Sequence, residues 1–597
     1  CIGARQPYRS QAEDDALDAE LFAVALELDH VVRQRLQHGV GGAPSEALEL
    51  ALLHLHHSFR ATYIGEQGYK ATAVYARLAA LVGLRDSSHV LALALDKLLF
   101  NLRSWPAASP VVQRSLQLFH DLSVGYVSVR QVAKLDGAKA LLAAHGADGA
   151  RFLGAVDAYK PRALYFAGLA RILFSADAPP PVFAAFMQPW ADTIGELLAM
   201  SDAQLALDHV RPSVLRVLRD LRGFLSAVAS KTHYALFFDW VRAAQRMQLV
   251  QRCVEMRGDA RVQIAALKFM AEFVFNRTQR LNFDVASPNG ILIFREASRA
   301  IWAYGSRVLE ERDVAVRDVY KERYKGVAAC FTILARLVSG KYVAIGVMPL
   351  YGDDALERAY RVAVELLKQF PVPDVIAYPK LGKATTALLE VLLARPNIDL
   401  VPLDDAAYEH IMRVCVEAFD HAETAVSSSA CGVIDGVLTA AIESDGSDVA
   451  KLVRARSDIT TYLLRAMLNI VLFEDRPNDW SFSRPLFCLI LLDTQFALQY
   501  TSQIVQYQPV ERREDLIKAL KELLSSTEFV LTTANRDRFT QALTQYRREV
   551  SAKNLILMVP TSQTLGAPVD ILAHSTAKDA AATGLERQEE EEASMVD

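Results

Sequence analysis

The segment from Phe275 to Val308 decides the fold class, and it reads FNRTQRLNFDVASPNGILIFREASRAIWAYGSRV. In its middle, Ser287 to Gly290 has the composition of a type I turn, with a polar residue first, proline second and glycine last. After this turn, a set of residues recurs at three- and four-residue spacing: Ile291, Phe294, Ser298, Ile301 and Tyr304/Gly305. This spacing predicts one buried face of a helix, so the segment predicts two helices joined by a turn.

The same period recurs from Asp354 to Phe370, where one side carries Leu356, Ala359, Ala363, Leu366 and Phe370. Asp354 is expected to cap this helix together with Glu357, which follows three residues later. Pro371 and Pro373 prevent the helix from continuing, because proline lacks the backbone N–H that the next turn requires.

Further helices are expected to begin near Pro379, Leu403 and Glu423. The helices that start at Asp354 and Leu403 lie 49 residues apart, close to the ~40–47-residue period of HEAT and armadillo arrays. No segment shows a strong alternating strand pattern. Residues 1–550 are therefore predicted to form an all-α, right-handed α-solenoid of HEAT-like antiparallel helix pairs, in which each pair buries its apolar face against the next.

The two ends of the chain carry different expectations. Residues 551–597 lose the helical period and contain Gln588 and four consecutive glutamates, so an acidic and largely disordered tail is expected there. The chain begins with Cys1, and no basic region followed by an apolar core opens it. This beginning is expected for a piece of a longer protein that starts without a targeting signal.

Composition excludes several classes of protein. The chain has 597 residues, 52% of them hydrophobic, and a formal net charge of −5, so it carries no basic footprint for nucleic acid. No charge-free apolar run reaches the roughly 18 residues of a membrane helix, and no membrane insertion is expected. Six cysteines without a C-x-x-C pair indicate a reducing compartment rather than a disulfide framework.

A search for catalytic and ligand motifs finds none that is complete. Leu381 to Thr385 reads LGKAT and lacks both the first glycine and the hydroxyl of a phosphate-binding loop. His54, His56 and His57 are dense, but zinc sites normally use three or four protein ligands, and no carboxylate or thiol stands at matching spacing. We therefore expect no catalytic residue, metal or cofactor, although an enzyme with a site assembled from distant segments remains an alternative.

Six charged residues are candidates for binding a partner: Arg277, Arg280, Asp353, Asp354, Arg536 and Arg538. Each has a structural alternative. The aspartates stand where acids commonly cap a helix. The arginines of Phe275–Val308 are placed to hold neighbouring helix ends, and those near residue 540, where Arg547 and Arg548 follow, are typical of a solvated helix face.

Several segments, in order along the chain, also have distinctive sequences: Asp121–Arg130 (DLSVGYVSVR), Arg219–Gly223 (RDLRG), Phe275–Val308, Leu350–Leu356 (LYGDDAL), Leu468–Asp475 (LNIVLFED), Trp480–Leu486 (WSFSRPL) and Asn535–Gln541 (NRDRFTQ). Together they resemble the C-terminal half of the exportin-7 family, which belongs to the karyopherin-β (importin-β) nuclear transport receptors. The resemblance runs from about Asp18 to Val550, and the acidic C-terminus departs from it.

This resemblance implies a superhelix of HEAT repeats that carries protein cargo through nuclear pores, with loading governed by the GTP-bound form of the small GTPase Ran. The implied partners are Ran-GTP, protein cargo and nucleoporins, and the implied location is the nucleus and cytoplasm. In the family the principal Ran-binding repeats are N-terminal and would precede Cys1, so this chain is expected to bind Ran more weakly than a full receptor. The alternative is a helical-repeat scaffold unrelated to Ran.

Overall fold

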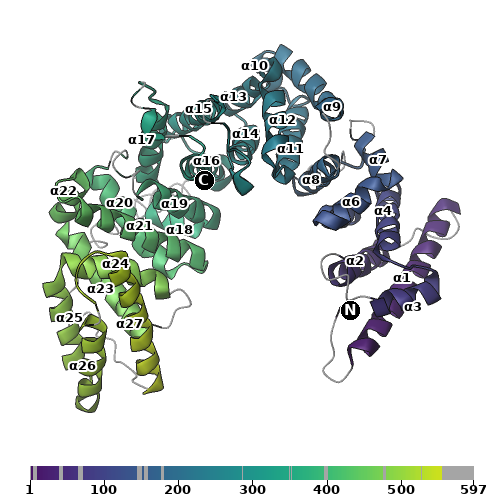
Figure 1. Cartoon of the computed structure of the whole chain (residues 1–597). Coiled ribbons are helices and arrows are strands. Elements are labelled where there is room, and N and C mark those ends of the chain that lie inside the picture. The colour runs from purple at the N-terminus through teal and green to yellow at the C-terminus, as the bar shows by residue number, and fades with distance from the viewer. Residues whose placement is uncertain are drawn as a thin grey trace, which may run out of the picture. The chain divides into compact units, whose positions relative to one another are not determined.

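The computed structural model describes residues 2–553, except 4–9, 39–44, 65–71, 144, 146–150, 154–158, 176–179, 285–286, 313, 344, 349, 351, 395–397, 399–400, 402, 475–478 and 526. Every regular element in these residues is a helix, which confirms the predicted all-α class (Figure 1). The chain divides into two compact units, Cys1–Ile293 and Phe294–Asp597. The predicted tail, 551–597, lies outside the described residues from residue 554 onward.

The first unit contains α1 (Gln11–His38), α2 (Glu46–Tyr63), α3 (Thr72–Val82), α4 (Ser87–Ser104), α5 (Ser109–Ser123), α6 (Tyr126–Lys134), α7 (Asp136–Ala143), α8 (Tyr159–Phe174), α9 (Pro180–Ala199), α10 (Asp202–Leu205), α11 (Arg211–Ala227), α12 (Lys231–Arg242), α13 (Met247–Glu255) and α14 (Ala260–Phe273). Within it α2, α5, α8, α11 and α14 pack in succession, each against the next. Partner helices such as α1, α4 and α13 lie against this row. The helices therefore stack as neighbours rather than around one shared centre.

The division between the units falls within α15 (Asn289–Glu310). The second unit continues with α16 (Lys325–Ser339), α17 (Ala355–Gln369), α18 (Val372–Ala377), α19 (Pro379–Leu392), α20 (Asp405–Glu417), α21 (Thr424–Glu443), α22 (Asp448–Ala455), α23 (Ser457–Phe473), α24 (Asp479–Leu492), α25 (Thr494–Tyr507), α26 (Val510–Ser525) and α27 (Thr533–Ala552). Here α16, α19, α21, α24 and α27 form one row of consecutive contacts, and α17, α20 and α23 form a second. Contacts such as α20 with α21 and α23 with α24 join the rows. This arrangement confirms the predicted solenoid of helix pairs.

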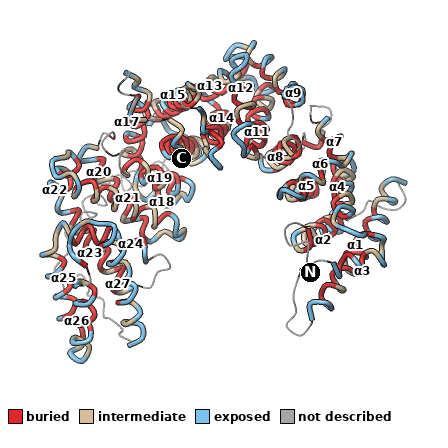
Figure 2. The backbone as a smooth tube through the Cα atoms, viewed as in Figure 1, coloured by how far each residue is buried: buried red, intermediate tan, exposed pale blue. Residues whose placement is uncertain are grey.

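Burial follows the same logic along each unit. Figure 2 shows buried residues on the sides of the helices that meet a neighbouring helix and exposed residues on the opposite sides. In α17 the predicted apolar face is confirmed, because Leu356, Ala359, Ala363 and Leu366 are all buried. Helices also begin at polar caps; Asp259, for example, accepts hydrogen bonds from the first backbone N–H groups of α14.

The predicted turn at Ser287 to Gly290 leads into a helix, and its last two residues belong to that helix. α15 begins at Asn289, and the carbonyl of Pro288 accepts a hydrogen bond from the backbone N–H of Leu292 at 3.0 Å. The first central residue of a type I turn has nearly helical dihedral angles, so such a turn continues smoothly into a helix. Phe294, Ser298, Ile301 and Tyr304 are buried as predicted, but Ile291 is not: it is 43% exposed.

The start of α17 also differs from the prediction. Asp354 makes no capping hydrogen bond with its side chain. Instead, Oδ1 of Asp353 accepts from the backbone N–H of Ala355 at 3.1 Å, and Asp354 pairs with Arg358. The short helix α18 was not predicted. Pro371 and Pro373 were expected only to prevent α17 from continuing, and proline at the first helical positions is compatible with a new helix.

Among the described residues, α21 is the one helix that is long and apolar enough to cross a membrane. Slightly more than half of its apolar window, 56%, is buried within the protein. α21 packs against α19 on one side and α24 on the other. Its burial and packing are thus those of a core helix. Within the described ranges, the one other combination that passes the same test is α3 with α4, and that pair is bent by 61°.

Candidate partner-binding site

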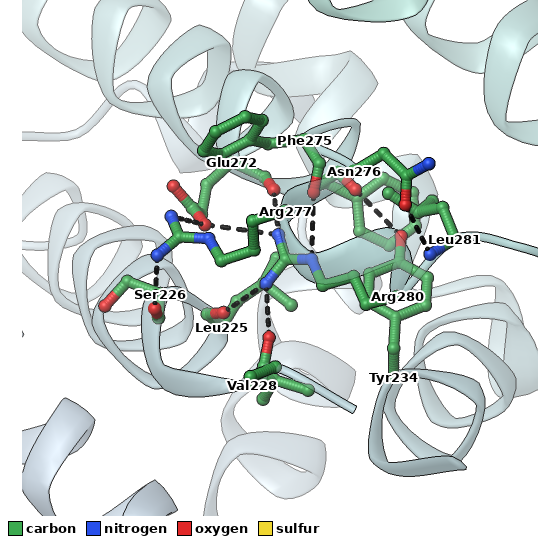
Figure 3. A network of polar contacts seen from close by, with 12 residues as sticks. Leu225, Ser226, Val228, Tyr234, Glu272, Phe275, Asn276, Arg277, Arg280 and Leu281 are labelled. Carbon is green, nitrogen blue, oxygen red and sulfur yellow. Dashed lines mark hydrogen bonds and ion pairs between the residues drawn. The ribbon is translucent and has the colours of Figure 1, made fainter. Parts of the chain in front are cut away.

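Arg280 is fully buried at the place where the ends of two helices meet (Figure 3). Its Nη1 donates to the carbonyls of Leu225 and Val228 at 2.8 and 2.6 Å, at the end of α11. Its Nη2 and Nε donate to the carbonyls of Glu272 and Phe275 at 2.6 and 2.9 Å, at the end of α14. Since the last carbonyls of a helix lack regular partners within it, Arg280 satisfies the ends of both helices at once.

The Arg280 cation lies beside a carboxylate that it shares with Arg277. Oε1 of Glu272 accepts from Arg277 at 2.6 Å and from Arg280 at 3.2 Å. The Arg280 guanidinium also lies 5.2 Å from the centre of the Tyr234 ring. Burial lowers the pKa of Arg280, and the Glu272 carboxylate opposes this shift. Hydrogen bonds from a charged donor are stronger than neutral ones, so the cluster clamps α11 to α14.

The backbone beside the clamp is strained. Thr278 and Gln279 have φ values of 50° and 60°, in the left-handed region that residues with a side chain rarely adopt. Neighbouring contacts hold this conformation: Oγ1 of Thr278 donates to the carbonyl of Ala229 at 2.6 Å, and Oδ1 of Asn276 accepts from the N–H of Leu281 at 2.8 Å. These hydrogen bonds therefore hold the segment in one conformation beside the ends of α11 and α14.

The structure gives Arg280 the second of its two predicted roles, that of holding helix ends. Its guanidinium is buried and its N–H groups already donate to backbone carbonyls. The expectation that Arg280 contacts a partner is therefore corrected. Arg277 donates to the carbonyl of Ser226 at 2.8 Å and keeps 32% of its side chain exposed. Only the exposed part of Arg277 is open to a partner.

Asp353 and Asp354 line a pocket of about 480 Å³ between α15 and the start of α17. The pocket is lined by Arg295, Ser298, Arg299, Trp302, Gly352, Asp353, Asp354, Ala355 and Arg358. Asp353 is mostly buried and accepts from Nε of Arg295 at 2.6 Å, while Asp354 is exposed and accepts from Nε of Arg358 at 2.7 Å. Asp353 thus has the predicted capping role, Asp354 does not cap α17, and both aspartates line the pocket.

The residues of α15 in this pocket were not singled out as a site in the sequence. Arg295, Ser298, Arg299 and Trp302 line the pocket from one side of the helix, and Arg295 with Arg299 and Ser298 with Trp302 are each four residues apart. Ser298 was assigned only to the buried face. The structure marks this pocket by Trp302, which is 46% exposed among arginines. The helical period alone does not predict that this tryptophan is exposed, so the sequence offered no clear signal for the pocket.

Arg536 and Arg538 of α27 have different surroundings. Nη2 of Arg536 donates to Asp435 at 2.5 Å, to Oγ1 of Thr439 at 2.6 Å and to Sγ of Cys488 at 3.2 Å. Burial raises the pKa of Asp435, and the Arg536 cation opposes that shift. Arg536 therefore joins α27 to α21 and α24, whereas Arg538 lies exposed on the surface of α27.

The LGKAT segment and the histidine group, which the sequence offered as candidate ligand sites, lie within helices and contact other parts of the protein. The LGKAT segment is inside α19, where Lys383 forms an ion pair with Glu423. Nδ1 of His57 lies 3.2 Å from a carboxylate oxygen of Asp121, and burial lowers the pKa of His56 to about 4. In the part of the chain that the structure describes, no group of three or more His, Cys, Asp or Glu side chains is placed to hold a metal ion.

Comparison with known proteins adds sequence relationships to this geometry. A family model described as "Exportin-7-like, TPR domain" matches residues 1–160. Exportin-7-A of Xenopus laevis is 34% identical over 572 residues, and Ran-binding protein 17 of Mus musculus is 32% identical over 573 residues; each alignment covers 92% of this chain and 52% of the relative. Exportin-7 of Dictyostelium discoideum is 28% identical over 513 residues. The chain spans about half the length of the curated relatives it matches.

Proposed function

The chain belongs to the exportin-7 family, and on this premise we propose that it acts in a nuclear transport receptor that binds protein cargo and Ran-GTP and carries the cargo through the nuclear pore. The observation that carries the proposal is the similarity over 92% of the chain to proteins named exportin-7 and Ran-binding protein 17. A helical-repeat scaffold unrelated to Ran has no comparable observation in its favour.

The architecture supports this proposal with a mechanism. Within each unit the described helices make most of their contacts with nearby helices of the stack, so the stack can bend through many small interfaces. A partner that touches several repeats selects the curvature that fits it best. If Ran-GTP and cargo favour the same curvature, each raises the affinity for the other through a coupling free energy of about 1–3 kcal/mol.

Release follows from the same coupling. Hydrolysis of GTP removes the partner that stabilised the cargo-binding curvature, and the cargo then dissociates. This cycle works by binding alone and assigns no chemical step to the chain. Passage through the pore adds contacts with nucleoporins and shuttling between nucleus and cytoplasm to the proposal.

A pull-down with nucleotide-locked Ran tests the proposal. The complete protein is immobilised and incubated with Ran loaded with a non-hydrolysable GTP analogue or with GDP, each with and without a cell extract as a source of cargo. We expect more Ran to be retained in the GTP form, and more in the presence of extract. Equal retention of the two forms, or none of either, contradicts the proposal.

A further inference from the structure

We infer that the outer face of α1 and α3 is an internal joint of the complete protein, covered there by an amphipathic helix from the part of that protein outside this chain. Neither Ran nor cargo takes part in this joint, so it goes beyond the proposed function. The outer face consists of Leu17, Leu21, Val24, Leu28 and Val31 on α1 and of Ala73, Ala76, Ala80 and Leu81 on α3.

α1 carries apolar residues on two opposite sides. One side is buried in the first unit, where Phe22 stacks on Phe59 of α2 with ring centres 4.0 Å apart and Ala25 packs with Leu52. The other side is open to solvent, and its large apolar residues are Leu17 (47% exposed), Val24 (51%), Leu28 (44%) and Val31 (44%). A helix that is apolar on all sides is normally buried on all sides.

The exposed residues of α1 have the spacing of a helix-packing seam. Leu17, Val24 and Val31 are seven residues apart, and the half-buried Leu21 lies seven residues before Leu28. Alternating steps of three and four residues form the stripe along which two helices pack side by side. At 1.5 Å per residue this stripe is about 21 Å long, which fits a partner helix of about four turns.

α3 extends the apolar surface. It lies beside α1 (Figure 1), and its exposed residues Ala73, Ala76 and Ala80 recur at helical spacing. Arg77 stands among these alanines and forms an ion pair with Glu20 of α1 at 2.5 Å. Glu20 borders the α1 stripe, so this ion pair joins the two surfaces into one face. Small side chains let a neighbouring helix approach closely.

The outer face differs from the surface of an interior helix of the same unit. α11, whose residues are all described, packs between α8 and α14, and no large apolar side chain on it is exposed. α1 packs mainly against α2 and α3 and leaves its second apolar side uncovered. A helix that closes the end of a solenoid needs a polar outer face. The outer face is therefore that of a helix inside a longer stack.

The length of the relatives indicates which helix covers the face. The alignment with Exportin-7-A of Xenopus laevis covers 52% of that protein, so about half of its length lies outside the matched part. A helix from the corresponding part of the complete protein continues the stack without a separate binding partner. A second copy of the chain and a cargo helix are the alternative occupants, and the experiment separates them.

Thiol labelling tests the joint. Val24→Cys is introduced into this chain and into the complete protein, both purified without Ran and cargo, and labelling by a maleimide is measured above that of the unchanged proteins. The matched control is Val127→Cys, at a residue of α6 that is 63% exposed. We expect both cysteines to react rapidly in this chain. In the complete protein Val24→Cys should react at least about tenfold more slowly, and Val127→Cys at an unchanged rate.

A charge placed in the face gives a second readout. Leu28→Glu should lower the melting temperature of the complete protein by about 3 °C or more, because the carboxylate would be buried in the joint. In this chain the same change should shift the melting temperature by less than about 1 °C, because Leu28 is exposed. Val127→Glu is the control and should have little effect in either protein. Val24→Cys is a milder change and keeps the test valid if Leu28→Glu does not fold.

Four results overturn the joint. They are equal labelling rates of Val24→Cys in the two proteins, slow labelling already in this chain, slow labelling of the complete protein only where light scattering shows a dimer, and slow labelling only after a cell extract is added. The third result assigns the face to a second copy and the fourth to cargo. Because Ran is absent, none of them changes the outcome of the nucleotide-locked pull-down, and the two failures are distinguishable.

Discussion

Arg280 shows how one side chain fixes the relation between two helices. Its single planar guanidinium donates to four carbonyl groups and one carboxylate at the ends of α11 and α14. Lysine cannot reproduce this pattern, because an ammonium group lacks the fixed fork of donors. The positive φ values at Thr278 and Gln279 are tolerated because this clamp and its neighbours hold the segment.

Replacing Arg280 by methionine should be strongly destabilising, because the buried Glu272 would lose one of its two cations and the carbonyls would lose their donors. Loss of one partner of a buried ion pair typically costs about 3–5 kcal/mol. The measurement is the free energy of unfolding of the first cooperative transition in urea, followed by circular dichroism.

Arg261→Met is the matched control, because the Arg261 side chain is 72% exposed and exposed ion pairs contribute little. If Arg280→Met has the same free energy of unfolding as Arg261→Met, the role assigned to Arg280 is contradicted. Arg280→Lys should fall between the two, since it keeps the charge and loses the geometry.

The contact between α8 and α11 depends on a residue without a side chain. A Cβ atom added to Gly223 would lie 2.6 Å from Cα of Ala163, which is backbone and cannot move aside. The same interface buries the ion pair of Arg162 with Asp220, whose two hydrogen bonds measure 2.6 and 2.5 Å. Glycine therefore permits the close approach on which this pair depends.

We predict that Gly223→Ala forces α8 and α11 apart and lowers the free energy of unfolding by about 1–3 kcal/mol, the usual cost of overpacking. Gly195→Ala is the matched control within α9, because a Cβ there meets nothing within 4 Å. That substitution should stabilise the protein by about 0.5–1 kcal/mol, since alanine favours a helix over glycine. Thermal melts of both variants check the prediction, and two changes of the same sign would contradict it.

Within each unit the described helices make most of their contacts with helices a few places away in the chain. Within the second unit, for example, α27 packs against α24 and α26. The stability of such a stack is approximately the sum of local terms, so damage in one place spreads little. The same locality lets a partner that binds several repeats select one curvature.

Hydrogen exchange of Gly223→Ala should show this locality directly. We predict faster exchange of backbone amides in α8 and α11, with unchanged exchange in α24 and α27. The Gly195→Ala variant, measured in parallel, should show faster exchange in none of these helices. Uniformly faster exchange along the chain would mean that the molecule unfolds as one unit and would contradict the solenoid account.

Local sequence determined the class of structure. The three- and four-residue spacing in α15 and α17 depends only on the geometry of a single helix, so it could be read without knowledge of neighbours. The helix starts at Ala355 and Asp405 agree with the predicted spacing of repeats. The sequence segments that resemble the family likewise indicated the family relationship, because sequence similarity can be recognised without knowledge of the conformation.

Tertiary structure alone decided what the charged residues do. The acceptors of Arg280 on α11 lie 52 and 55 residues away, and Asp435 lies 101 residues from Arg536. No local period specifies which distant carbonyl or carboxylate a side chain will meet. The same holds for the pocket, where Ser298 and Trp302 meet Asp353 and Asp354 only because α15 lies beside the start of α17. Burial and pairing are properties of packed surfaces, and these exist only once the helices have stacked.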